Sequence, residues 1–65
     1  MFTDTIARVK ELAAQRGISL RKLAILCDVP YSTLKSTELR GGQIQVDTIE
    51  KICEGLDIPL YRFFQ

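Results

Sequence analysis

Apolar residues recur at intervals of three and four along most of this chain, and no segment alternates strictly between apolar and polar positions. That spacing gathers apolar side chains on one face of an α-helix. The sequence therefore predicts an all-α fold of five short helices in a compact, right-angled stack. The expected helices cover residues 4–16, 20–27, 31–39, 46–56 and 60–64, and the third begins at Pro30 or Tyr31.

Residues suited to helix ends flank the first two of these segments. Thr3 is the expected N-cap of the first helix, and Asp4 favours the positive end of its dipole. Gly17 can adopt the left-handed conformation that ends this helix. Ser19 can then cap the second helix through its hydroxyl oxygen.

The residues expected to form the core share the inward faces of the five helices. They are Ile6, Val9, Leu12, Ala13, Leu23, Ala24, Cys27, Leu34, Ile49, Ile52, Cys53, Leu56, Leu60, Phe63 and Phe64. Arg8, Lys10 and Glu11 are expected outside, on the polar face of the first helix.

The pattern CDVPY at residues 27–31 recurs as LDIPL at residues 56–60. In each copy an Asp follows a helix, a β-branched residue packs inward, and a Pro presets the backbone for the next helix. We interpret the two copies as two uses of the same sharp corner.

Length and composition indicate one globular domain over residues 1–65. Apolar residues make up 46% of the chain and charged residues 26%, and no apolar run approaches the roughly 20 residues of a membrane span. The amino end lacks the basic and apolar regions of a signal peptide, so we expect a cytoplasmic protein. Two cysteines without histidine cannot supply four zinc ligands, and we interpret both as buried apolar residues, although a single disulfide also fits the count.

Charge is unevenly distributed along the chain. Residues 16–43 carry five Lys or Arg against two Asp or Glu, whereas residues 44–65 carry two against four. The basic middle third suits a polyanionic partner, but charges of either sign also solvate a surface. The absence of histidine, of a glycine-rich phosphate loop and of room for a lined pocket predicts no enzyme activity and no cofactor.

The second and third predicted helices, with their tight link, form a helix-turn-helix arrangement. Tyr31, Ser32 and Thr33 then stand at the amino end of the third helix, where they can reach DNA bases or phosphates. A second explanation is equally open, because Ser and Thr also satisfy free amides in a first turn and Tyr31 can pack on the domain surface.

Residues 8–64 resemble the Cro and phage-repressor type of helix-turn-helix domain, often called the XRE family. The resemblance rests on RVKELAAQRGIS, LRKLAILCDVPYSTLKS and VDTIEKICEGLDIPLYRFF in their order and spacing. It implies a lambda-repressor-like five-helix domain that binds specific sequences of double-stranded DNA, usually as a homodimer on a palindromic operator.

By position, the resemblance implies two sets of DNA contacts. Those that read bases are Tyr31, Ser32, Lys35 and Ser36. Those that touch phosphates are Ser19, Arg21, Thr33, Arg40 and Gln43. The chemistry is compatible, because Lys can donate to guanine and Ser can bond either way. Arg21 and Lys22 are also explained as ordinary solvated charges.

The chain departs from the family pattern at several positions. Leu20 stands where relatives often carry Gln, which removes one polar contact, and Ile44 replaces a frequent Pro. Arg40 replaces the usual glycine stop, so the third helix either runs longer or shifts so that Leu39 helps fill the core. The acid matching Glu38 pairs in relatives with an Arg that is Ala13 here. We therefore expect it to pair with another cation, Arg8 or Arg16, or to face solvent.

These features predict a bacterial or phage-like transcriptional regulator, a repressor that binds duplex DNA and no metal or membrane. The dimer contact is expected at Leu60, Tyr61, Phe63 and Phe64, although the two Phe side chains can also close the core. The rival hypothesis is a protein-interaction module on the same fold, such as an antitoxin, antirepressor or adaptor.

Overall fold

A computed structural model of the protein describes residues 4–64, which form five α-helices and no strand. The helices are α1 (Thr5–Gln15), α2 (Leu20–Leu26), α3 (Tyr31–Arg40), α4 (Val46–Leu56) and α5 (Leu60–Phe63). The predicted all-α class is confirmed, and every helix end agrees with its predicted position to within one residue. In the part of the chain described, no helix has both the length and the apolar character needed to cross a membrane.

The beginnings of α1 and α2 are fixed by side-chain caps. Asp4 Oδ1 accepts a hydrogen bond from the Ala7 amide at 3.2 Å, so the N-cap is Asp4; Thr3 lies outside the described residues. Ser19 Oγ accepts from the Lys22 amide at 3.0 Å, as predicted. Each cap satisfies an amide that the helix itself leaves unpaired.

The two repeated corners have the same backbone geometry. Asp28 and Asp57 follow α2 and α4 in the left-handed conformation, with φ of 57° and 58°. The next amide in each corner folds back on the helix: Val29 donates to Ala24 O at 2.9 Å and Ile58 donates to Cys53 O at 3.0 Å. This pairing is the Schellman motif, so the shared sequence pattern corresponds to one shared helix ending.

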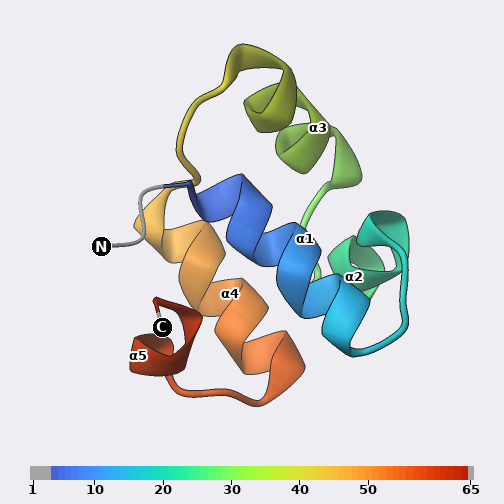
Figure 1. The fold of residues 1–65 in the computed structure, drawn as a ribbon, viewed down its shortest axis with the longest axis vertical. Coiled ribbons are helices and arrows are strands. Elements are labelled where there is room, and N and C mark those ends of the chain that lie inside the picture. The colour runs from blue at the N-terminus through green and yellow to red at the C-terminus, as the bar shows by residue number, and fades with distance from the viewer. Residues whose placement is uncertain (1–3, 65) are drawn as a thin grey trace.

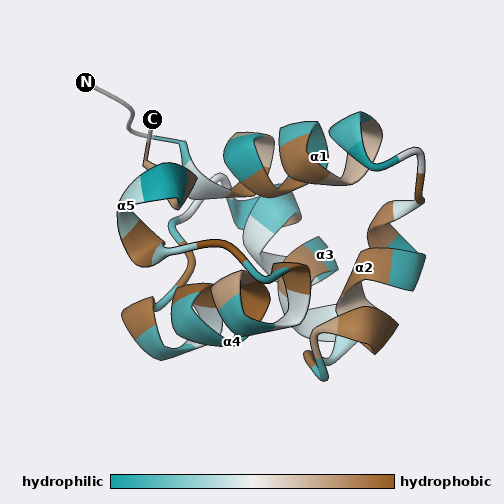
Figure 2. Cartoon of the chain, turned by 90° about the horizontal axis from the view of Figure 1, so that it is seen from below, coloured by the Kyte–Doolittle hydropathy of each residue, from teal (hydrophilic) through white to brown (hydrophobic). Residues whose placement is uncertain are grey.

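Figure 1 shows α1 crossing the middle of the molecule, with α3 on one side and α4 and α5 on the other. Seen from below, α1 and α4 lie on opposite sides of the interior, α2 and α5 lie at its two ends, and α3 stands behind (Figure 2). The largest fully buried side chains come from all five helices: Phe63, Leu23, Leu34, Ile52, Leu56 and Val9.

Both cysteines are buried and free, as the sequence predicted. Burial raises the pKa of the Cys27 thiol and of the Cys53 thiol, because an apolar environment disfavours the thiolate. Both side chains therefore serve as small apolar core residues.

Gly55 on α4 lies directly against Cys27, the residue that ends α2. A Cβ atom at this position would lie 2.6 Å from Cys27 Sγ and 2.7 Å from Cys27 Cα. Glycine is therefore required here for steric reasons, since the backbone of α2 occupies the space that a side chain would need.

The prediction that Arg8 lies on the outer face of α1 was wrong. Arg8 is only 8% exposed, and its guanidinium reaches the end of α5. Nε donates to Phe63 O at 2.6 Å and Nη2 to Arg62 O at 2.8 Å, while Nη1 pairs with Glu11 at 2.6 Å. These bonds satisfy the buried charge and explain how its burial is tolerated.

The presence of Arg40 in place of a glycine left two alternatives for the third helix: a longer helix, or a shift that places Leu39 in the core. The helix continues through Arg40, and Gly41 ends it in the left-handed conformation with φ of 67°. The longer helix is therefore the alternative found, and the alternative in which Leu39 helps fill the core is excluded, since this side chain is 83% exposed.

Candidate nucleic-acid interface

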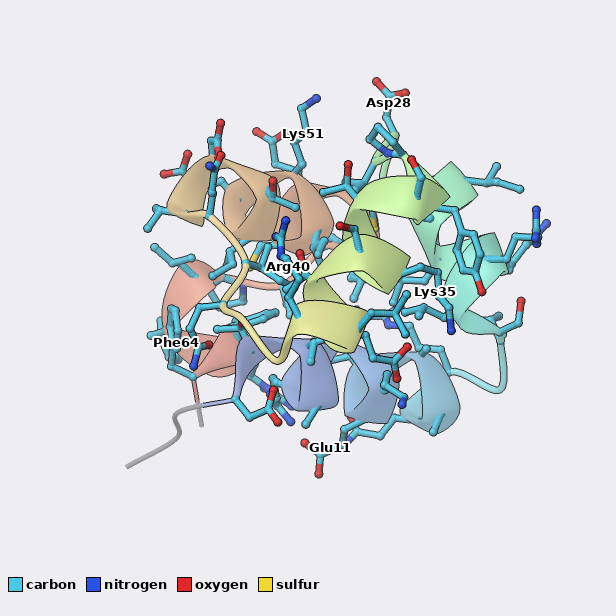
Figure 3. All side chains as sticks on the ribbon, turned by 90° about the horizontal axis from the view of Figure 1, so that it is seen from above. Glu11, Asp28, Lys35, Arg40, Lys51 and Phe64 are labelled. Atoms are coloured by element: carbon cyan, nitrogen blue, oxygen red, sulfur yellow. The ribbon has the colours of Figure 1, made fainter. Side chains whose placement is uncertain are left out.

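Helix α3 presents a largely polar face to solvent, and its one exposed large apolar side chain is Leu39, near the carboxyl end. Leu34 and Thr37 point inward, and the Thr37 hydroxyl donates to Thr33 O at 2.9 Å. Four side chains predicted to contact DNA are exposed along the opposite face: Ser32, Thr33, Ser36 and Arg40. Figure 3 looks onto this helix, with Lys35 toward one edge and Arg40 at its carboxyl end.

The same four residues line a shallow, open depression on the surface. Three hydroxyls and one guanidinium make this surface able both to donate and to accept hydrogen bonds, with a positive charge at one end. Such a surface suits a polar, negatively charged partner better than an apolar one.

Tyr31, at the first position of α3, is half-buried and packs against the core. The guanidinium carbon of Arg21 lies 4.5 Å from the centre of its ring, a cation–π contact between α2 and α3. The structure thus shows the surface packing that the sequence left as one alternative for Tyr31. It also brings two of the predicted site residues together.

Lys35 and Glu38 form an ion pair one turn apart on α3. Lys35 Nζ donates to Glu38 Oε1 at 3.0 Å, and Lys10 Nζ on α1 donates to Glu38 Oε2. Glu38 therefore pairs with other cations, as expected, but the suggested partners Arg8 and Arg16 were wrong; Arg16 instead donates to Leu56 O at 2.6 Å. The hydrogen bonds from Lys10 and Lys35 lower the pKa of Glu38, and the bond to Glu38 raises the pKa of Lys35.

Ser19 and Gln43 are the first and last residues along the chain that are predicted to contact phosphates. Ser19 Oγ uses a lone pair to cap α2, which leaves its own hydroxyl hydrogen able to be donated. Gln43 Oε1 accepts from the amide and the hydroxyl of Thr5 at 3.0 and 2.9 Å. The Ile44 amide donates to the same hydroxyl at 2.8 Å, so the loop after α3 is fastened to the start of α1.

A groove between α4 and α5 has the opposite charge. Its lining combines three carboxylates with three apolar side chains: Glu50, Glu54, Asp57, Cys53, Ile58 and Leu60. The depression on α3 thus contains one cation, Arg40, whereas this groove contains three carboxylates. Within residues 4–64, no group of three or more His, Cys, Asp or Glu side chains is arranged to hold a metal ion.

The predicted dimer contact on α5 is divided between surface and core. Phe63 is completely buried within the monomer, so it offers no surface to a partner. Leu60, Tyr61 and Phe64 are exposed. The Phe64 ring packs edge-on against Phe63, with ring centres 5.1 Å apart at 73°, so the exposed ring is held in place from below.

Lys10 was not identified from the sequence as part of the surface around α3, where it pairs with Glu38. No pattern along the chain could reveal it, because Lys10 belongs to α1 and reaches Lys35 only through Glu38. Its position depends on how α1 packs against α3, which is a property of the fold.

Comparison of the chain with protein-family models, with curated proteins and with solved structures finds no match. The arrangement of residues on α2 and α3 is therefore the basis for assigning a function.

Proposed function

We propose that this protein is a sequence-specific DNA-binding regulator of transcription, a lambda-repressor-like helix-turn-helix domain that inserts α3 into the major groove. One observation carries the proposal: the exposed side chains of α3 from Ser32 to Ser36 are all polar, and Arg40 adds a cation at the carboxyl end of the same surface. The short link between α2 and α3 supports the same arrangement, and Ser32 and Thr33 in the first turn of α3 are exposed.

Base recognition falls to Ser32, Lys35 and Ser36. An ammonium group can donate to guanine O6 or N7, and a serine hydroxyl can donate or accept in the major groove. Ser32 and Ser36 are fully available at the surface, and the half-buried Lys35 stem leads its ammonium to solvent. Tyr31 contributes its ring to the edge of this surface, held by Arg21.

Phosphate recognition falls to residues on either side of α3. Ser19 and Arg21 stand at the start of α2, Thr33 lies in the first turn of α3, and Arg40 ends α3. Gln43 belongs to the same set, and its bonds to Thr5 support a second role in fixing the loop beside Arg40. Such contacts position a protein on DNA and supply most of its salt-dependent affinity.

We further propose that the protein acts as a repressor in the form of a homodimer. Leu60, Tyr61 and Phe64 provide an exposed apolar surface for a second copy, whereas Phe63 does not take part. A twofold pair of α3 helices would read two half-sites about 34 Å apart, one turn of the duplex.

Selection of bound duplexes from a random DNA pool at two salt concentrations tests this function. We expect enrichment of a palindrome, with affinity that falls steeply as salt increases. A pool that stays random at both salt concentrations would contradict the proposal.

A second candidate function is a protein-interaction module without DNA affinity. It is favoured by Ile25 and Leu26, adjacent side chains on α2 that are 70% and 51% exposed. An apolar protein interface depends little on salt, so binding that is insensitive to salt would favour this alternative.

A further inference from the structure

The carboxylate of Glu38 links two lysines from different helices. Its Oε1 accepts from Lys35 on α3, and its Oε2 accepts from Lys10 on α1. Each oxygen therefore holds one ammonium, and the three side chains form a continuous bridge between the two helices. We call this group the Lys10–Glu38–Lys35 bridge.

The bridge is accessible to a macromolecular partner. The Lys10 and Lys35 side chains are 53% and 44% exposed, whereas Glu38 between them is 25% exposed. The mutual hydrogen bonds favour the charged forms of Glu38 and Lys35, since they lower the pKa of Glu38 and raise that of Lys35. The bridge therefore presents one net positive charge instead of two.

The geometry limits what each lysine can do. An ammonium group has three N–H donors, and Glu38 occupies one of those on Lys35. The two remaining donors can still bond a base, but the adjacent carboxylate repels any phosphate that approaches the same ammonium. Lys10 is under the same constraint on the α1 side.

We propose that Glu38 is a specificity-determining positioning residue: it orients Lys35 for contact with a base and prevents Lys10 and Lys35 from binding phosphates without regard to sequence. This inference rests on the proposed DNA-binding function. Through Lys10, the inference also includes α1 in the surface that determines which DNA sequences are bound.

The Glu38→Gln substitution tests the inference, because it removes the charge and keeps the shape of the side chain. Affinity for the pool-enriched duplex and for a scrambled duplex is measured over a range of salt concentrations. We expect the variant to bind the scrambled duplex more tightly than the wild type does. The salt slope, meaning the slope of log affinity against log salt concentration, should become steeper by about 0.9 for each lysine that gains a phosphate contact. Each gained contact corresponds to about a 3- to 4-fold greater loss of affinity when salt rises fourfold.

The ratio of specific to scrambled affinity should fall by roughly tenfold, a typical discrimination from one well-oriented base contact. Glu38→Asp keeps the charge and should retain the wild-type slope on the scrambled duplex. Glu54→Gln, in the groove between α4 and α5, makes the same change of net charge away from α3 and should leave the ratio unchanged.

Lys10→Gln gives a second, independent measurement. We expect it to flatten the scrambled-duplex slope by about 0.9 in the Glu38→Gln background and to have a smaller effect when Glu38 is present. Thermal unfolding of each variant verifies that it is folded at the temperature of the binding experiment.

An unchanged slope and ratio in Glu38→Gln, or an equal effect of Lys10→Gln in both backgrounds, would overturn the inference while wild-type DNA binding stands. Failure of the wild-type protein to bind any duplex would instead overturn the proposed function. The two failures are therefore distinguishable.

Discussion

The Arg8 guanidinium donates a 2.6 Å hydrogen bond to the carbonyl oxygen of Phe63, 55 residues later in the chain. A second bond to Arg62 O makes Arg8 the cap of the last helix. Because α5 has only four residues, its own hydrogen bonds cannot hold it in place. Arg8 and the burial of Phe63 thus attach the carboxyl end of the chain to α1.

Replacing Arg8 by Met should lower the free energy of unfolding by about 3 kcal/mol, because two carbonyl oxygens lose charged donors. Urea unfolding measures the change. Arg62→Met is the matched control at an exposed position and should change stability by less than about 0.5 kcal/mol. Equal stability of the Arg8 variant and the wild type would show that the capping bonds contribute nothing.

Gly55→Ala should destabilise the protein by about 1–3 kcal/mol, because the new methyl group would overlap Cys27 and force α2 away from α4. Gly42→Ala is the control, since a Cβ there meets nothing within 4 Å. That substitution should be neutral or stabilise by up to about 1 kcal/mol through the unfolded state. Similar unfolding midpoints for the two variants would contradict the close approach of the helices.

Lys35→Ala should weaken binding to the selected duplex by about 1–3 kcal/mol and relax the preference at one base position. The reason is the loss of an ammonium that can donate to guanine. Binding of a panel of single-base variants of the operator measures the effect. The same loss on every sequence would show that Lys35 contacts only phosphate.

Arg40→Ala should reduce the slope of log affinity against log salt concentration by about one unit and leave sequence preference intact, because we propose that its guanidinium contacts a phosphate. Lys51→Ala is the control: it removes the same charge from α4, and Lys51 lies beside the corner between α2 and α3, outside the depression that contains Arg40. An Arg40 variant whose salt slope equals that of the wild type would remove Arg40 from the contact surface.

The sequence was sufficient for the helices and for both corners, because these features depend on local patterns. Asp28 and Asp57 have the predicted place after a helix, and Leu23 and Leu34 have the predicted place in the core. Periodicity placed Leu34 of α3 in the core, whereas Lys35, Ser36 and Arg40 were assigned to its outer surface through the family resemblance.

Interactions between distant segments could not be predicted in the same way. The partners of Arg8 are backbone carbonyls, which every residue has, so no residue type marks them. Glu38 pairs with Lys10 because of the way α1 packs against α3. The need for glycine at position 55 likewise depends on the approach of Cys27 from another helix.

The most direct test of the central claim is an NMR titration of the ¹⁵N-labelled protein with the pool-enriched duplex. We expect the largest amide shifts at the amino half of α3, from Tyr31 to Ser36, and at Ser19 to Lys22. The groove between α4 and α5 should change little. Shifts concentrated at that groove, with the amides of α3 unaffected, would contradict the claim that α3 is the helix that binds DNA.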